Sequence, residues 1–548
     1  MKSLLCRIAS RIRQRPQTPE VAIWKKVLDG HLTQSRGGLR VLYATSVGGH
    51  DIVRAVDTVV STALAMRGAQ VHVLLCDGIL HACEQCAYAW FPDQSNFLAN
   101  GPQNSLCPNC YGRGAAVWKE VTANLHLYGH FISADERREI EGAAETASVE
   151  ECLLWKEADV SIGEQVRAAV IRYFGNSSIE DEDQETLKLV SRRYLAAALT
   201  TLLVVQRCLE LTDAQVVVSH HGIYVPQGIV GQVARSRGVR VVNWATSYRD
   251  QTVIFSHGNT YHYTIMEEPV EKWAAVELTP DREKRLLAYL RSRQQGKGDW
   301  SFMGTERRGT TDPVPSNLWQ KLALDENKPT FALLTNVLWD AQLFYRNNAF
   351  RDMLEWLFIT IDYFVEHPEL QLVVRIHPHE RKAGTRQLTN FEIRKHYQTL
   401  PSNVVVVDME SEISTYEIVD ICRLALIYGT KMGVELTPFG IPVIACGEAW
   451  IRGKGISLDI HSKDQYLDVL SSLQSIEQLD ENVRKRAQQY AYHFFFRRMI
   501  PIKVLESSKT YNVALSFENI EALAAGSDAG LDTICNGILE GSDFIHDD

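Results

Sequence analysis

Short apolar runs alternate with amphipathic runs along most of the chain. The first such unit has a buried strand at 39–44, a Gly-rich turn at 47–50, a helix at 53–66 and a second strand at 70–75. Gly68 stands where this helix should stop, which is typical of the residue after a helix C-terminus. The pattern therefore predicts a β-α-β unit with parallel strands.

The same alternation continues after residue 210 and again in the second half of the chain. Short apolar strands separated by helices are typical of doubly wound α/β sheets. We therefore expect two Rossmann-like domains that face each other across a cleft. The further strands that we predict are 214–219, 239–244, 330–334, 370–376, 403–407, 424–427 and 441–445.

Composition divides the chain into five parts. Polar, Gly-broken sequence near 295–315 marks the boundary between the two halves. The first domain carries two insertions, a cysteine-rich one at 83–110 and a charged, mostly helical one at 115–210. The predicted parts are a basic helical arm (1–38), the first Rossmann-like domain (39–265), a linker (266–325), the second Rossmann-like domain (326–480), and C-terminal helices with an acidic tail (481–548).

The charge and hydropathy of the chain exclude several classes of function. Its 548 residues include 57 Lys and Arg against 67 Asp and Glu, a net charge of -10, so we expect no binding to nucleic acid. No apolar run reaches the length of about 18 residues that a membrane span needs, and residues 1–7 lack the apolar core of a secretory signal. We expect a cytoplasmic protein.

The N-terminal arm is basic and amphipathic. Arg7 and Arg11 lie among Leu4, Ile8 and Ile12, which recur at roughly helical spacing. Such a helix binds anionic membrane surfaces, which would make the protein peripheral at the inner face of the membrane. The alternative is a helix that packs on its own domain, since its apolar face is small.

Four cysteines form two closely spaced pairs. Cys83 and Cys86 are separated by two residues, 20 residues follow, and Cys107 and Cys110 repeat the spacing. This pattern matches paired zinc knuckles, and four thiolates leave no open position on the metal, so we predict structural zinc. An iron–sulfur cluster uses the same ligands and is the less expected alternative. The second alternative is that these are four ordinary buried thiols that bind no metal.

In the second half, polar residues follow two of the predicted strands. Arg375 and His377 stand at the end of one strand, and a forked cation beside an imidazole suits a phosphate. Thr430 and Lys431 begin a short helix after another strand, where backbone N–H groups favour anions. Glu435 follows one turn later and can accept hydrogen bonds from ribose hydroxyls. The alternatives are a structural Arg, a capping His and a solvated Glu.

These stretches resemble a known enzyme family. The segments 375–378, 428–436 and 439–443 are similar to the R-x-H-P strand end and the S-x-x-G-x-E-A…G-x-P-V helix of the capsule polysaccharide biosynthesis glycosyltransferases, which are GT-B enzymes. The resemblance covers about residues 330–460 and implies that this half holds the nucleotide of an activated sugar. Leu436 stands where the family has Ala. GT-B epimerases and glycerophosphotransferases share parts of the pattern.

The first half offers two histidines at strand ends. His50 follows the turn Val47-Gly48-Gly49, and His221 follows the strand that ends near Ser219. Each could act as the general base that takes a proton from an acceptor hydroxyl, and His50 is the favoured candidate. Adjacent residues diverge as they leave a strand, so we expect only one of His220 and His221 to face the cleft. The alternative is that they are loop or cap histidines.

Together these observations predict a glycosyltransferase that moves a sugar from a nucleotide sugar to a carbohydrate or lipid-linked acceptor. No Asp-x-Asp motif stands near a donor-site strand, so no catalytic metal is expected. Two alternatives remain open at this point. One is a nucleotide-sugar epimerase of the same fold, and the other is a non-catalytic zinc-containing scaffold with a degenerate transferase fold.

Overall fold

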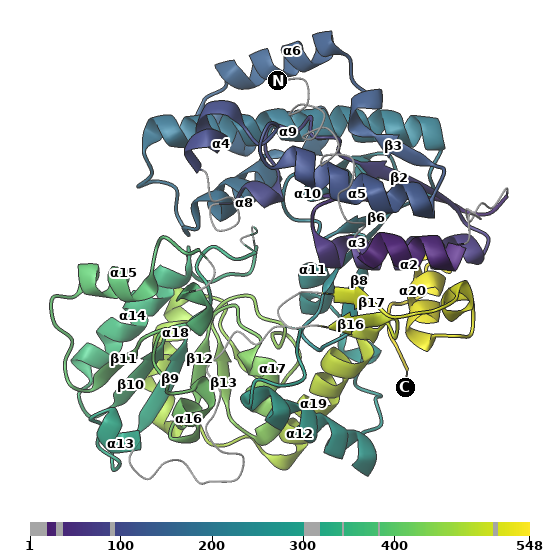
Figure 1. Ribbon diagram of the computed structural model, residues 1–548. Coiled ribbons are helices and arrows are strands. Elements are labelled where there is room, and N and C mark those ends of the chain that lie inside the picture. Colours follow the sequence, from purple (N-terminus) through teal and green to yellow (C-terminus); the bar gives the residue numbers. More distant parts are fainter. Residues whose placement is uncertain are drawn as a thin grey trace, which may run out of the picture.

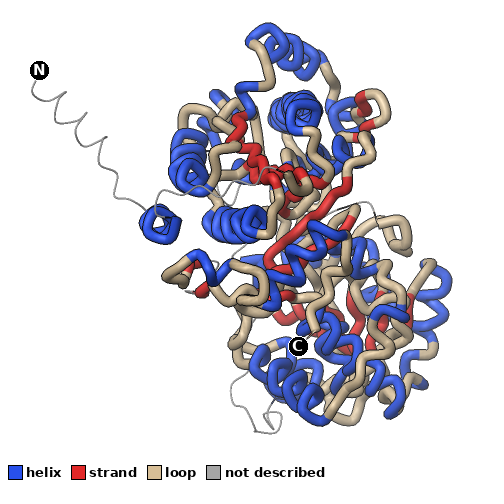
Figure 2. The backbone as a smooth tube through the Cα atoms, turned by 90° about the vertical axis from the view of Figure 1, so that its right-hand side faces the viewer, coloured by secondary structure: helices blue, strands red, loops and turns tan. Residues whose placement is uncertain are grey.

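The chain folds into two α/β domains, each built on its own sheet (Figure 1). Figure 2 shows the strands of both domains enclosed between helices. The expectation of two separate sheets is confirmed. The computed structural model describes residues 19–28, 37–87, 94–300, 318–341, 343, 345–381, 384–507 and 513–547.

The first sheet has the strand order of a Rossmann fold. Its strands lie in the order β15-β8-β7-β6-β1-β2-β3, and all pair in parallel except β8 and β15. The order reverses between β1 and β6, which is the switch point where ligands bind in such sheets. The strands are β1 (Arg40–Ser46), β2 (Gln70–Leu75), β3 (Leu125–Leu127), β6 (Val216–His220), β7 (Arg240–Thr246), β8 (Thr252–His257) and β15 (Ile500–Pro501).

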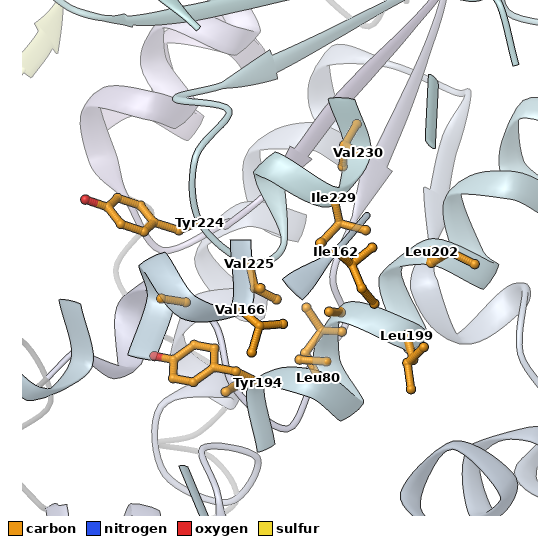
Figure 3. Close-up of a cluster of buried hydrophobic side chains, with 14 of the residues drawn as sticks. Leu80, Ile162, Val166, Tyr194, Leu199, Leu202, Tyr224, Val225, Ile229 and Val230 are labelled. Carbon is orange, nitrogen blue, oxygen red and sulfur yellow. The ribbon is translucent and has the colours of Figure 1, made fainter. Parts of the chain in front are cut away.

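Alternate residues of these strands face two helical layers. Val41 and Tyr43 of β1 are buried on the side of α3 and α5, whereas Leu42 and Ala44 are buried on the side of α8, α9 and α10. Figure 3 shows part of the second cluster. The helices of this domain are α2 (Pro19–Leu28), α3 (Asp51–Met66), α4 (Gln94–Asn100), α5 (Cys107–Val121), α6 (Ala134–Thr146), α7 (Val149–Leu154), α8 (Gly163–Phe174), α9 (Gln184–Thr212) and α10 (Gln227–Ser236).

The second sheet is parallel throughout and repeats the same order. Its strands lie in the order β11-β10-β9-β12-β13-β14, so its switch point lies between β9 and β12. Phe331 and Leu333 of β9 pack under α14, whereas Ala332 and Leu334 face the layer that contains α17 and α19. The strands are β9 (Thr330–Leu334), β10 (Gln371–Arg375), β11 (Val404–Val407), β12 (Ala425–Ile427), β13 (Val443–Ala445) and β14 (Leu458–Asp459).

The C-terminal part of the chain returns to the first domain. After α19 a π-helical turn leads to β15, which pairs antiparallel with β8. Helix α20 then packs on α3, as the yellow C-terminal segment in Figure 1 shows. The elements of the second half are α13 (Leu318–Lys321), α14 (Met353–Glu366), α15 (Thr389–His396), α16 (Thr415–Asp420), α17 (Met432–Leu436), α18 (Lys463–Ser471), α19 (Glu481–Tyr492), β16 (Leu505–Ser507), β17 (Val513–Leu515) and α20 (Ala529–Glu540).

The two chain crossings between the domains lie against each other. The outgoing crossing follows β8 through α11 (Tyr261–Met266), and the returning one is the π-helical turn. Glu268 joins them, because its carboxylate is 3.0 Å from His493 Nε2 and 3.3 Å from Arg498 Nε. The side chains of this clamp are almost fully buried.

The segment expected to be a linker contains a helix that packs into the second domain. Helix α12 (Pro280–Gln294) occupies part of 266–325 and buries Leu286 and Leu290 in the core of the second domain. Its polar sequence hid this role, because only a narrow stripe of the helix faces inward. Residues 301–317 lie outside the described residues.

Two further expectations concern the surface of the first domain. Helix α2 packs on α5 and buries Trp24, so this part of the N-terminal arm covers its own domain. Residues 1–18, which carry the predicted amphipathic helix, lie outside the described residues. Helix α9 is long and apolar enough to cross a membrane by length and composition, but 72% of its most apolar window is buried inside the protein.

Candidate functional site

Both switch points open onto one cavity of about 2510 Å³. The first domain contributes the loops that follow β1 and β6, and the second contributes those that follow β9, β10 and β12. Five of the seven residues predicted for catalysis or nucleotide binding line it, and two do not. Those that line it are His50, His221, His377, Thr430 and Lys431.

Four imidazoles form the first-domain wall. The ring centroid of His220 lies 6.0 Å from that of His50 and 5.6 Å from that of His221, and His262 lies 6.2 Å from His221. The expectation that only one of His220 and His221 faces the cleft is wrong, since both line it. Sequence patterns missed His262, because it follows β8, a strand that pairs antiparallel and was not predicted.

These imidazoles are neutral at ordinary pH. Burial lowers the pKa of His50 to about 4, with the nearby charge of Arg172 as the next cause, and burial lowers that of His262 to about 3. Burial likewise lowers the pKa values of His220 and His221. Each ring therefore offers one N–H and one lone pair. Arg172, on α8, lines the same wall, and no sequence motif marked it.

His221 is held in a strained conformation. Its φ of 61° lies in the left-handed region, which is uncommon for a residue other than Gly. Its backbone N–H donates to the carbonyl of Trp244 at 2.7 Å, and Nδ1 has no partner in the described part of the chain. Such strain concentrates at functional sites, where the surrounding structure fixes it.

His377 presents a ring N–H on the second-domain wall. Its Nδ1 accepts a hydrogen bond from the backbone N–H of His379 at 3.1 Å, so the proton of the neutral ring sits on Nε2. Burial, with Lys431 as the next cause, lowers the pKa of His377 to about 3. Its own backbone N–H donates to Thr335 Oγ1 at 2.9 Å, which ties the loops after β9 and β10 together.

The turn after β12 brings Thr430 and Lys431 to the same wall. Thr430 Oγ1 accepts the N–H of Met432 at 3.3 Å, and the N–H of Gly429 donates to Asn336 Oδ1 at 3.3 Å. Lys431 Nζ lies 4.6 Å from the ring centroid of Tyr248, which belongs to the first domain. Helix α17 has only five residues, so charge and hydroxyl groups matter more here than a helix dipole.

Glu435 does not line the cavity. Its Oε1 accepts from Arg293 Nη2 at 3.1 Å, and its Oε2 accepts from Tyr416 OH at 2.5 Å. Burial opposes ionisation, but Arg293 and Lys431 outweigh it and hold the pKa of Glu435 below its usual value. The carboxylate predicted to bind ribose is therefore used inside the domain, where it lies 3.8 Å from Lys431 Nζ and acts as its counter-ion.

Arg375 is also absent from the cavity lining. It is 1% exposed, and its Nη1 donates to the carbonyl oxygens of Val407 and Asp408. The side chain thus ties β10 to the end of β11. The prediction that Arg375 and His377 share one side fails because the chain leaves the strand after Arg375.

The cysteines gather near the His50 loop without forming a ligand set. Cys83 precedes a 3-10 turn and Cys86 is its last residue, whereas Cys107 and Cys110 lie in the first turn of α5 rather than in a knuckle. The described residues contain no group of three or more His, Cys, Asp or Glu placed to hold a metal ion. The cysteine pairs are nevertheless close enough that Cys83 contributes to raising the pKa of Cys110 to about 11, after burial as the main cause. Zinc stays a prediction.

No protein-family model matches the sequence, and no curated protein matches it. Similar solved structures include KpsC from Thermosulfurimonas dismutans, a beta Kdo 2,4 transferase, with 16% identity over 57% of this chain and 87% of that one and a TM-score of 0.34. Another is the UDP-GlcNAc 2-epimerase from Neisseria meningitidis, with 10% identity over 83% and 96% and a TM-score of 0.26. A third is the Streptomyces sp. SF2575 glycosyltransferase SsfS6, with 12% identity over 83% and 94% and a TM-score of 0.24.

Replacing Glu435 tests its place in the buried cluster. Glu435→Ala leaves Arg293 with excess buried charge, so we expect the free energy of unfolding to fall by about 3–5 kcal/mol. Denaturant unfolding measures this, with Glu481→Ala as an exposed control. An unchanged stability together with weaker nucleotide binding would instead indicate that Glu435 lines the cavity and binds the nucleotide.

The cysteine prediction is tested by metal analysis of the purified full chain. We expect bound zinc that is lost in Cys107→Ser and kept in Cys446→Ser, since Cys446 is buried in the second domain. Mass spectrometry of the native protein and elemental analysis measure the metal. Protein that holds neither zinc nor iron would contradict the prediction.

The neutral imidazoles make folding stability depend on pH. Above pH 6.5 His50 is neutral in both the folded and the unfolded chain, so protonation of His50 takes nothing from the folding stability there. Below that pH the unfolded chain binds a proton that the folded chain excludes, and stability falls until the pH approaches about 4. Between pH 7 and 5 we expect a loss of about 1–2 kcal/mol from this residue. Denaturant unfolding of His50→Gln should show a smaller loss, and an equal loss would contradict the lowered pKa.

Proposed function

We propose that this protein is a glycosyltransferase that moves a sugar from a nucleotide-sugar donor to a carbohydrate or lipid-linked acceptor. The observation that carries the proposal is that the switch points of both Rossmann-type sheets open onto one cavity. One wall supplies hydrogen-bond donors and a lysine, and the other supplies neutral imidazoles. A group transfer between two bound molecules needs one wall that stabilises the leaving group and another that accepts a proton from the attacking group.

The second-domain wall suits the donor. His377 offers a ring N–H, Thr430 a hydroxyl, and Lys431 an ammonium group to the phosphates of a nucleotide sugar. These groups are held in place before the substrate arrives, so they stabilise the negative charge that grows on the departing phosphate. Glu435 keeps Lys431 oriented toward the cavity rather than binding the ribose itself.

The first-domain wall suits the acceptor. The neutral ring of His50 accepts the proton of an acceptor hydroxyl while that oxygen forms a bond to the anomeric carbon. The bond from the anomeric carbon to the phosphate oxygen breaks in the same step, and its electrons stay on the phosphate. The anionic donor favours protonated His50, which raises the pKa of this base when the substrates are bound.

The size of the cavity favours transfer over epimerisation. Ordinary small-molecule pockets span about 300–1,000 Å³, which is enough for a nucleotide sugar alone. The cavity of about 2510 Å³ leaves room for a second molecule beside the donor. The strained His221 and the neutral imidazoles also argue against a degenerate scaffold. Backbone strain costs folding free energy and concentrates at sites that bind a ligand or catalyse a reaction.

Nucleotide binding tests the donor site. We expect one of CMP, UDP, GDP or CDP to raise the melting temperature of the full chain, because a ligand that binds the folded state stabilises it. His377→Ala and Lys431→Ala should each weaken that nucleotide by roughly ten- to a hundredfold in calorimetry, as expected for a lost hydrogen bond to a charged group.

Matched variants outside the cavity are His367→Ala and Lys485→Ala, which should bind the nucleotide as the natural chain does. Unchanged affinity in both cavity variants would move the donor site elsewhere. Release of nucleotide from the nucleotide sugar that depends on an added acceptor supports transfer, whereas conversion of the donor without an acceptor would favour epimerisation.

A further inference from the structure

The loop that carries His50 is held from outside its own β-α unit. Cys110 Sγ on α5 accepts the backbone N–H of Gly49 at 3.1 Å. Arg113, one turn later on α5, donates from Nη1 to the carbonyl of Gly49 at 3.4 Å and from Nη2 to the Asp51 carboxylate. Helix α5 therefore binds the residue before His50 and the residue after it.

A close approach of two backbones fixes the same contact. A Cβ atom on Gly48 would lie 2.9 Å from Gly114 Cα and 2.9 Å from the Cys110 carbonyl, and one on Gly114 would lie 2.7 Å from Gly48 Cα. Neither position accepts a side chain without movement of the main chain. The loop and the helix thus have one relative position, set by two glycines.

Asp51 receives a second guanidinium from within its own helix. Arg54 donates to Asp51 Oδ1 at 2.9 Å and to the Gly48 carbonyl at 2.9 Å, and its Nε bonds Glu20 at 2.7 Å. Arg54 is thus part of the local fold of α3. Arg113 differs, because it is the charged link between this loop and the cysteine insertion.

The cysteine insertion in turn fixes the start of α5. Cys107 and Cys110 form its first turn, and the backbone of Gly78 approaches so closely that a Cβ there would lie 3.0 Å from Cys107 Cβ. The side chain of His50 makes no capping bond to its own helix. The position of α5 therefore bears on the backbone on both sides of His50, from which the imidazole projects.

We propose that Arg113 is a positioning residue for His50, through which the cysteine insertion of the first domain orients the catalytic base. The role of His50 as base rests on the proposed function, but the positioning contact does not. Arg113 binds the carbonyl of the peptide unit between Gly49 and His50 and the side chain of Asp51, so it restricts the backbone from which the His50 ring projects. A base misplaced by about 1 Å loses roughly a hundredfold in rate.

The first experiment needs no substrate. Diethyl pyrocarbonate acylates neutral imidazoles, and mass spectrometry reads the rate at each histidine of the full chain. We expect Arg113→Gln to change the rate at His50 at least about threefold, while His377 in the other domain keeps its rate. Arg113→Lys should restore most of the natural rate, because it keeps the donor to Asp51. Lys119→Gln is the matched control, since Lys119 lies on the same helix but is exposed.

The second experiment reads turnover, as release of nucleotide from the nucleotide sugar selected by the thermal-shift screen. We expect kcat of Arg113→Gln to fall roughly ten- to a hundredfold with an unchanged Kd for the nucleotide, since the donor wall lies in the other domain. Arg113→Lys should recover part of kcat. A melting temperature close to that of the natural chain excludes simple unfolding.

The outcomes separate the two proposals. Unchanged acylation of His50 in Arg113→Gln, or an equal change in Lys119→Gln, overturns the positioning role. A changed acylation rate in a chain that neither binds nor cleaves any nucleotide sugar leaves the positioning contact in place and overturns the proposed function. A kcat that stays constant while acylation changes also overturns the positioning role, because His50 would then move without consequence.

Discussion

In each sheet, the helices that follow the two central strands lie on opposite faces of the sheet. After β1 the chain runs to the α3 face of the first sheet, and after β6 it runs to the α10 face. In the second sheet α14 and α17 separate in the same way after β9 and β12. Adjacent parallel strands whose following helices take opposite faces leave a crevice between their loops. The cleft exists because two such crevices face each other.

The two walls of this cleft differ in the charge state of their buried groups. The second domain buries Arg293, Asp299 and Glu435 as a compensated cluster and exposes Lys431 at its edge. A buried ion is tolerated when it is paired, and the pairing here also holds Lys431 at the cavity wall. The first domain instead keeps its histidines uncharged by burial, next to Arg172. The proposed sugar transfer, with an anionic leaving group on one side and a proton acceptor on the other, would use this contrast.

The sequence predicted the strands that carry the site better than it predicted the site itself. Apolar runs such as 70–75 and 330–334 match β2 and β9, because fully buried parallel strands consist almost wholly of apolar residues. The short strands β3, β14 and β15 contain two or three residues and leave no periodic pattern.

Side-chain direction at strand ends was the main obstacle to predicting the site. His377 and Lys431 reach the cleft, whereas Arg375 and Glu435, which belong to the same motifs, turn into the domain. Their partners, Asp408 and Arg293, come from segments that no local motif connects to them. Arg172 and His262 were missed for other reasons, since Arg172 lies on α8 without a recognisable motif and His262 lies on α11, after the unpredicted strand β8.

The Glu268 clamp joins the two chain passages between the domains. Each domain is attached to the other by two covalent passages, and the clamp holds these passages within hydrogen-bonding distance of each other. Two passages joined at one place restrict the relative positions of the domains more than a single flexible linker would. The two walls of the cavity, with His50 on one and Lys431 on the other, are therefore joined by a buried polar contact as well as by the chain itself.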